Sequence, residues 1–251
     1  MAFENPLLAA WRAGRPTLGL WCSTANAALG EYAASVDPDF ILWDQQHGLV
    51  TDGDLAQCFR GVLGTTIAPL ARVAANDLTL IGRALDAGAY GVVVPLVNSA
   101  AEAAAAARAC RYPPDGERSF GPNRIALVMG GLNPKKLGEV ACIVMVETAA
   151  GLANVDAIAS TPGVDAILIG PSDLAIGLGL APDDRGPTHA AAVKRVADSC
   201  RAHGIAAGIV LGDGATARRH LDLGFQFINV ATDLGLIMNG LRTELAVARG
   251  S

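Results

Sequence analysis

Residues 141–174 read ACIVMVETAAGLANVDAIASTPGVDAILIGPSDL, and they contain the repeating unit on which the fold depends. Two apolar runs, IVMV at 143–146 and AILIG at 166–170, flank a stretch whose pattern is amphipathic. A run that is apolar at every position is typical of a strand buried on both faces of a parallel sheet. The order strand, helix, strand therefore predicts a parallel βα unit.

The same alternation continues in both directions along the chain. The predicted strands are Thr17–Trp21, Phe40–Trp43, Ile67–Arg72, Gly91–Pro95, Cys142–Val146, Ala166–Ile169, Ala206–Val210 and Phe227–Val230. The helical patterns between and after them are Asp52–Leu63, Leu78–Ala87, Ala100–Arg111, Leu152–Ser160, His189–His203, Ala215–Leu223 and Asp233–Arg249. Three helices end in a glycine just before the next strand (Gly88, Gly204 and Gly224), as expected for left-handed caps that turn the chain back.

Eight strands in strict alternation with helices predict a closed (βα)8 TIM barrel. The length of 251 residues fits one such domain spanning residues 1–251. A doubly wound open sheet is the alternative, but it usually has five to six strands and a Gly-rich first turn. The first turn here, Trp21-Cys22-Ser23-Thr24, has no such glycines.

Two segments do not fit the simple alternation of strands and helices. Residues 112–139 form a long connection rich in Pro and Gly, which is typical of a functional lid or an interface arm. The last helix, Asp233–Arg249, has apolar residues on overlapping faces, so we expect it to cap the barrel or to dock on a neighbouring subunit.

The composition excludes several classes of protein. Hydrophobic residues make up 51% and charged residues 17%, which argues against disorder. A net charge of −5 gives no reason to expect nucleic acid or an anionic membrane as partner. No apolar run reaches the roughly 18–20 residues of a membrane helix, and the N-terminal segment lacks the pattern of a secretory signal. We therefore expect a cytoplasmic protein. Its five cysteines include no CxxC, which favours neither a disulfide framework nor a zinc knuckle.

In such barrels the reacting groups lie at the C-terminal ends of the strands. The polar residues that directly follow predicted strands are Asp44, Gln45, Gln46, His47, Arg72, Glu147 and the turn Gly170-Pro171-Ser172-Asp173. We expect these residues to converge on one mouth of the barrel.

Glu147 and Asp173 are the candidate metal ligands. Each follows a buried run, where a lone carboxylate is costly unless a cation compensates it. Oxygen ligands without His or Cys favour Mg²⁺ or Mn²⁺, with Co²⁺ and Zn²⁺ as alternatives. The competing interpretation is that each carboxylate pairs with an arginine on a loop.

The turn at Gly170 opens a helix, so the amides of Ser172, Asp173 and Leu174 are expected to face outward and bind a carboxylate or phosphate. The alternative is a simple helix cap. Arg72 is expected to stabilise negative charge that develops on a substrate oxygen, or else only to hold Glu147 or Asp173 in place.

His47 is the one histidine placed where catalysis is expected, and with Asp44 nearby it could serve as a general base. A purely structural His47 is the alternative. The lysines are not placed for catalysis. The chain has only Lys135, Lys136 and Lys194, and none of them ends a predicted strand. Catalysis through a Schiff base needs a buried lysine, so that mechanism is not expected.

With these residues assembled, the chain resembles the HpcH/HpaI family of class II, metal-dependent pyruvate aldolases. The likeness runs roughly from Thr17 to Gly240. Its marks are LGLW (18–21), WDQQHG (43–48), Ala71-Arg72 followed by Asn76-Asp77, VVVPLV (92–97), RYPPDGERSFG (111–121), VMVET (144–148) and LIGPSDLA (168–175).

The resemblance implies cleavage or formation of 4-hydroxy-2-oxo acids from pyruvate or hydroxypyruvate and an aldehyde, through a metal-chelated enolate. Glu147 and Asp173 would bind the ion, and Arg72 would stabilise the enolate oxygen. His47, oriented by Asp44, would move the proton of the aldol hydroxyl through water. The turn Gly170-Pro171-Ser172-Asp173 would hold the substrate carboxylate, and Trp21 and Gln46 would line the substrate site. The resemblance also implies a homohexamer, a trimer of dimers, with the last helix exchanged.

One departure from the family pattern is Gln46, which stands directly before His47 where family members carry an acidic residue. Gln46 keeps hydrogen bonding but removes a charge from the site of proton transfer. Two alternatives remain at this stage. A CoA-thioester lyase of the citramalyl- or malyl-CoA type would share the barrel, although this chain lacks a larger C-terminal extension and a basic surface. A non-catalytic binding protein would also share it, but the complete set of polar strand-end residues argues against lost chemistry.

Overall fold

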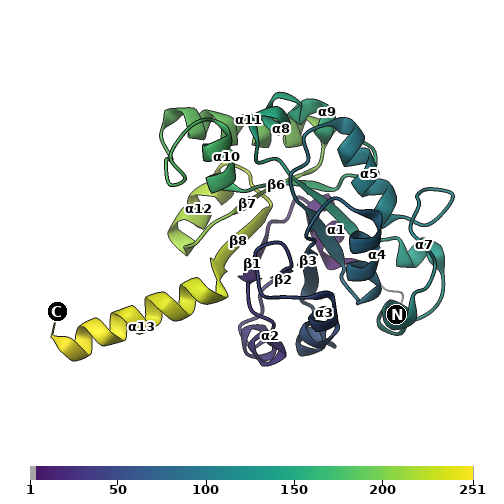
Figure 1. Ribbon diagram of the computed structural model, residues 1–251, viewed down its shortest axis with the longest axis horizontal. Coiled ribbons are helices and arrows are strands. Elements are labelled where there is room, and N and C mark those ends of the chain that lie inside the picture. The colour runs from purple at the N-terminus through teal and green to yellow at the C-terminus, as the bar shows by residue number, and fades with distance from the viewer. Residues whose placement is uncertain (1–3, 251) are drawn as a thin grey trace.

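The computed structural model describes residues 4–250, in which eight parallel strands close into a barrel in sequence order (Figure 1). The strands are β1 (Thr17–Cys22), β2 (Phe40–Asp44), β3 (Ala68–Arg72), β4 (Gly91–Val94), β5 (Ala141–Met145), β6 (Ala166–Ile169), β7 (Ala206–Val210) and β8 (Phe227–Thr232). The pairing of β8 with β1 closes the sheet. The predicted (βα)8 barrel is therefore confirmed and the open sheet is wrong; the strand bounds differ from those predicted by only one or two residues.

The helices surround this barrel (Figure 1). They are α1 (Pro6–Arg12), α2 (Ala27–Ala34), α3 (Asp52–Cys58) with the 3₁₀ turn η1 (Phe59–Val62), α4 (Leu78–Asp86), α5 (Ala100–Cys110), α6 (Asn123–Met129), α7 (Pro134–Leu137), α8 (Ala149–Ala153), α9 (Val155–Ala159), α10 (Pro171–Gly177), α11 (Pro187–His203), α12 (Gly214–Asp222) and α13 (Asp233–Arg249). The helix predicted at 152–160 is two short helices that meet at Asn154.

Alternation along each strand produces two apolar layers. In β2, Phe40 and Leu42 face the barrel interior, whereas Ile41 and Trp43 face the surrounding helices, and all four are fully buried. The interior layer is closed at the N-terminal ends of the strands by α1, whose Trp11 packs edge-on against Phe227 with ring centroids 5.4 Å apart. The core thus fixes the strands and leaves only their C-terminal ends free for a site.

The long segment 112–139 lies at the N-terminal ends of the strands, opposite the end at which the site is expected. It connects α5 to β5, and Asn5 beside α1 donates to the carbonyl of Glu139, 3.1 Å away. Arg118, with 1% exposed, anchors the segment through an ion pair of 2.6 Å with Asp86 at the end of α4. The prediction of a lid over this chain's own site is therefore wrong, because a connection from helix to strand returns to the N-terminal end of the sheet.

Helix α13 projects away from the barrel from the end of β8 (Figure 1). It carries large apolar residues that are 39–73% exposed: Leu234, Leu236, Ile237, Met238, Leu241, Leu245 and Val247. The expectation that it caps its own barrel is wrong. Within residues 4–250 no helix combines the length and apolar character needed to cross a bilayer.

Candidate active site

The strand-end residues predicted to converge do so because of the sheet register. Asp44 at the end of β2 lies directly opposite Arg72 at the end of β3. Met145 of β5 lies opposite Leu168 of β6, so Glu147 and Gly170, each two residues further along, leave the barrel side by side. The four segments form one mouth at the C-terminal ends of the strands.

Glu147 is a buried carboxylate without a cationic partner at hydrogen-bonding distance in the described residues. Only 3% of it is exposed, and its Oε1 accepts a hydrogen bond of 2.8 Å from the backbone N–H of Leu96 after β4. Burial raises the pKa of Glu147; the Leu96 amide opposes the rise, the charge of Asp173 adds to it, and the charge of Arg72 opposes it. A carboxylate in this position is costly to ionise alone and would ionise readily beside a bound cation.

The second oxygen of Glu147 and the carboxylate of Asp173 converge at Gly170. The point at which a Cβ on Gly170 would sit lies 2.6 Å from Glu147 Oε2 and 3.6 Å from Asp173 Oδ2. Both oxygens thus lie within 4 Å of one point at the mouth. No group of three or more His, Cys, Asp or Glu side chains suited to a metal occurs in residues 4–250, so this pair would need substrate or water as further ligands.

Asp44 and Arg72 form a two-pronged ion pair beside these carboxylates. Arg72 Nε donates to Asp44 Oδ1 at 2.7 Å and Nη2 to Oδ2 at 2.5 Å, and both residues are buried. The guanidinium also lies over the ring of Trp21, 4.7 Å from its centroid. Burial raises the pKa of Asp44, but the hydrogen bonds and charge of Arg72, with the amides of Gln46 and His47, outweigh it and leave the pKa below its ordinary value.

His47 and Gln46 lie at the edge of the mouth. Asp44 Oδ1 accepts from the backbone N–H of Gln46 at 2.9 Å and from that of His47 at 3.4 Å. Asp44 thus fixes the main chain of His47, and no hydrogen bond to the exposed imidazole occurs among the described residues. The Oε1 atom of Gln46 is buried and has no partner in that part of the chain, which marks it as a candidate substrate contact.

The start of α10 offers fewer donors than predicted. Leu174 donates its backbone N–H to the carbonyl of Gly170 at 2.9 Å, so the expectation that this amide is available is wrong. The amides of Ser172 and Asp173 form no hydrogen bond within residues 4–250, and Pro171 has no N–H to offer. Two adjacent donors therefore remain at the positive end of the helix.

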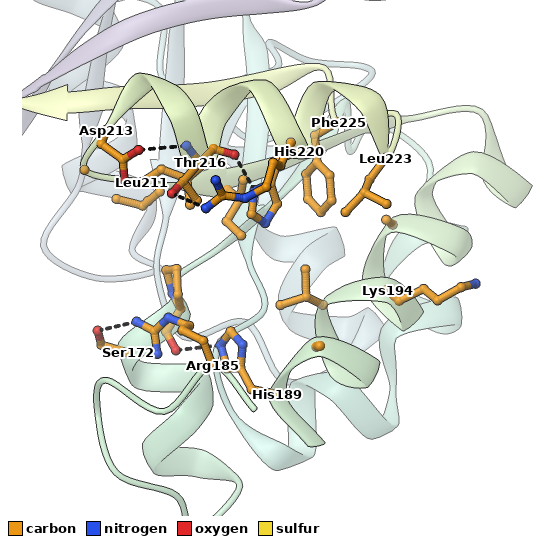
Figure 2. Close-up of a pocket in the computed structure, with 18 of the residues that line it drawn as sticks. Ser172, Arg185, His189, Lys194, Leu211, Asp213, Thr216, His220, Leu223 and Phe225 are labelled. Atoms are coloured by element: carbon orange, nitrogen blue, oxygen red, sulfur yellow. Dashed lines mark hydrogen bonds between the residues drawn. The ribbon is translucent and has the colours of Figure 1, made fainter. Parts of the chain in front are cut away.

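Two residues that support α10 were missed from the sequence. His189, predicted only as the first residue of a helix, is buried in α11 with its Nε2 3.0 Å from the carbonyl oxygen of Pro171. Arg185 donates to Ser172 Oγ at 3.2 Å (Figure 2). Neither contact has a sequence signal, because the partners come from packing between helices. Both residues also line a mainly apolar groove of about 870 Å³ between α11 and α12, whose lining includes Pro171 and Ser172 at the start of α10 and residues 211–213 after β7 (Figure 2).

The lysines lie on helices, and the cysteines belong to the apolar core. The three lysines lie on helices α7 and α11. All five cysteines are buried and free, as expected from their spacing. The residues brought together are therefore the carboxylates Glu147 and Asp173, the pair of Asp44 with Arg72, and the turn at Gly170.

Comparison with known proteins gives a consistent result. Residues 17–240 match the model of the family described as HpcH/HpaI aldolase/citrate lyase. The chain is 37% identical to a hydroxypyruvate/pyruvate aldolase of Rhizorhabdus wittichii, over 98% of this chain and 99% of that enzyme. It is 33% identical to a 5-keto-4-deoxy-D-glucarate aldolase of Klebsiella pneumoniae, over 93% of each. Among solved structures, an HpcH/HpaI aldolase/citrate lyase family protein from Burkholderia cenocepacia superimposes with a TM-score of 0.93 at 34% identity, covering 98% of this chain and 100% of that one.

Proposed function

Because the chain belongs to the HpcH/HpaI aldolase/citrate lyase family and is an aldolase, we propose that Glu147 and Asp173 bind a divalent metal ion at its active site. We further propose that the enzyme cleaves or forms 4-hydroxy-2-oxo acids, with pyruvate or hydroxypyruvate as one component and an aldehyde as the other. The relatives named above are aldolases, and this favours the aldolase over a CoA-thioester lyase.

The observation that carries the proposal is the convergence of two carboxylate oxygens at Gly170. The residues present fit a hard cation: both ligands are oxygens, one is buried, and Gly170 leaves the space between them free of a side chain. Oxygen-only ligation favours Mg²⁺ or Mn²⁺. Once bound, such an ion would draw electrons from a 2-oxo group and acidify the neighbouring C–H bond.

The other residues act on the substrate around that position. Asp44 occupies Nε and Nη2 of Arg72, so Nη1 remains to donate to an oxygen that gains negative charge. The amides of Ser172 and Asp173 hold the substrate carboxylate at the start of α10. Trp21 forms the wall on which Arg72 lies and keeps the guanidinium flat against the mouth.

His47 transfers the proton of the aldol hydroxyl group. It is exposed, so a water molecule between its imidazole and the substrate conveys the proton. The contact of Asp44 with the His47 main chain fixes the loop while leaving the ring free to reorient. Gln46, with its unpartnered buried oxygen, accepts a hydrogen bond from a substrate hydroxyl.

We also propose that the enzyme works as a homohexamer, a trimer of dimers, in which α13 is exchanged between copies. The exposed apolar side chains of α13 support this assembly, because a monomer would leave them in water. A second copy of the chain provides the matching surface.

The test combines metal binding with the first chemical step. Chelator-treated enzyme should exchange the methyl protons of pyruvate in D₂O, followed by NMR, only after Mg²⁺ or Mn²⁺ is added. The Glu147→Gln variant should lose both Mn²⁺ binding and exchange, whereas Glu31→Gln, which changes an exposed carboxylate on α2, should retain both. Exchange that survives exhaustive chelation would refute the proposal. An aldehyde panel with each 2-oxo acid then identifies the acceptor and the preferred nucleophile.

A further inference from the structure

The backbone of Leu96, between β4 and α5, is in an unfavourable conformation. Its φ is +56°, in the left-handed region that a branched side chain rarely adopts. Within residues 4–250 the one other non-glycine residue with positive φ is Asp37, a residue type that tolerates this region. Leu96 is 51% exposed, so burial of its side chain does not compensate the strain. Contacts with neighbouring residues must therefore hold it in place.

The strained residue serves Glu147 directly. The N–H of Leu96 donates to Glu147 Oε1 at 2.8 Å, which directs the other oxygen, Oε2, towards Gly170 and Asp173. Rotation of Leu96 into an ordinary conformation would turn this N–H away from the carboxylate. Strain located at a functional group in this way is expected when the strain contributes to pre-organisation.

The side chain of Asn98 holds Leu96 in this conformation. Its Nδ2 donates to the carbonyl of Leu96 at 2.8 Å, and its Oδ1 accepts from the hydroxyl of Thr148, the residue that follows Glu147. The Thr148 hydroxyl oxygen in turn accepts from the N–H of Gly151 at 2.9 Å, so its proton is directed at Asn98. One amide group therefore joins the turn after β4 to the turn after β5.

The main chain of Asn98 is itself fixed on both sides. Its N–H donates to Glu102 Oε2 at 2.6 Å, and its carbonyl accepts from Asn154 Nδ2 at 2.7 Å. Val97, between the two residues, donates to the carbonyl of Met145 at 3.1 Å and continues the ladder with β5. Because the main chain of Asn98 is fixed, its side-chain amide is held at a defined position relative to the carbonyl of Leu96.

From these contacts we propose that Asn98 is a positioning residue for Glu147: it holds Leu96 in the left-handed conformation, so that the Leu96 amide fixes one carboxylate oxygen and leaves the other for the cation. The inference rests on the proposed metal site. It assigns a role in the affinity of that site to a residue of the turn between β4 and α5 that forms no hydrogen bond with either carboxylate among the described residues.

The test measures Mn²⁺ affinity by titration calorimetry of the full chain, with thermal unfolding of each metal-free variant as a check of folding. Asn98→Ala should bind Mn²⁺ about tenfold more weakly, the factor expected if about 1.4 kcal/mol of strain is no longer held. Leu96→Gly should bind nearly as well as the parent, because glycine adopts the left-handed region freely. The double variant should recover part of the lost affinity relative to Asn98→Ala, a rescue that a merely structural role would not produce.

Asn133→Ala is the matched control, because it removes an asparagine side-chain bond at the start of α7, distant from the mouth, and should bind like the parent. If Asn98→Ala does not fold, Thr148→Ala against Thr148→Ser tests the same link, and only the serine variant should retain full affinity. Equal affinity of Asn98→Ala and the parent would overturn the inference, as would a double variant as weak as Asn98→Ala. A parent that does not bind Mn²⁺, or a Glu147→Gln variant that binds as well as the parent, would instead overturn the metal site itself.

Discussion

Replacement of Gly170 by alanine adds a single methyl group and should prevent Glu147 and Asp173 from binding a cation together. The added methyl carbon would lie 2.6 Å from Glu147 Oε2 and 3.2 Å from the terminal methyl of Met145. An ordinary close contact between carbon and oxygen is about 3.3 Å, so the carboxylate must move by about 0.7 Å. Metal–ligand distances tolerate about 0.2 Å, so the displaced oxygen no longer satisfies the coordination geometry.

The cost follows from what holds Glu147. To move Oε2 the side chain must rotate, and this weakens the hydrogen bond from the Leu96 amide to Oε1. A hydrogen bond to a charged group contributes about 1.5–3 kcal/mol, which corresponds to a loss of Mn²⁺ affinity of about 10- to 100-fold. Activity at a fixed, subsaturating Mn²⁺ concentration should fall by the same factor.

Titration calorimetry with Mn²⁺ and the exchange of pyruvate methyl protons measure the two effects. Gly82→Ala in α4 is the control, because nothing lies within 4 Å of the new methyl group and the helix should gain about 0.5–1 kcal/mol in stability. If Gly170→Ala binds Mn²⁺ as tightly as the parent while remaining folded, the cation does not bind between Glu147 and Asp173.

Three further predictions concern the neighbouring groups. Asp44→Asn should lower the free energy of unfolding at pH 7 by about 3 kcal/mol, because it leaves the buried Arg72 unpaired. Arg72 lowers the pKa of Asp44 in the folded state, so this stabilisation is present at pH values above the ordinary pKa of Asp and is lost as the pH falls through the lowered pKa. Urea unfolding at pH 7 and near pH 3 should therefore show a smaller difference in unfolding free energy between parent and variant at the lower pH. A difference that does not change with pH would contradict this prediction. Arg72→Lys should lower kcat about 100- to 1000-fold with little change in Mn²⁺ affinity, because lysine cannot both fork onto Asp44 and face the substrate; a kcat near that of the parent, measured at saturating substrate, would remove Arg72 from the chemistry. Ile237→Asp with Leu241→Asp should yield smaller assemblies in light scattering with an unchanged circular dichroism spectrum, and an intact hexamer would show that this face of α13 is not an interface.

The barrel could be predicted from the sequence because each strand is a continuous apolar run between longer amphipathic stretches. The same signal fails for α1 and α2, which were not predicted. Helix α1 has only seven residues, and its Leu7 and Trp11 are apolar because they close the barrel interior, a contact with strands far away in the sequence. Local periodicity cannot report such a contact.

The candidate site could be predicted in its side chains but not in their partners. The strand-end rule selects Asp44, Arg72 and Glu147 from the sequence alone. That rule does not give the strand register, which places Asp44 opposite Arg72. Asp44 was expected to orient the imidazole of His47, but its carboxylate forms an ion pair with Arg72 and contacts His47 only at the backbone N–H. The Leu96 amide could not be predicted at all, because every residue except proline carries an N–H and only the fold determines which of them meets a carboxylate.

The opposite pKa shifts of the two buried carboxylates fit the two roles proposed for this mouth, the binding of a cation and the stabilisation of an oxyanion. Asp44 has a guanidinium partner that lowers its pKa, and that ion pair is neutral as a unit. Among the described residues, Glu147 has the Leu96 amide but no hydrogen-bonded cation, and burial together with the charge of Asp173 raises its pKa. A bound divalent cation would offset the charge of both carboxylates, which is the role proposed for them above. Since the lysines lie on α7 and α11, Arg72 is the side chain that we expect to meet charge on the substrate, once the proposed cation offsets the charge of Glu147 and Asp173.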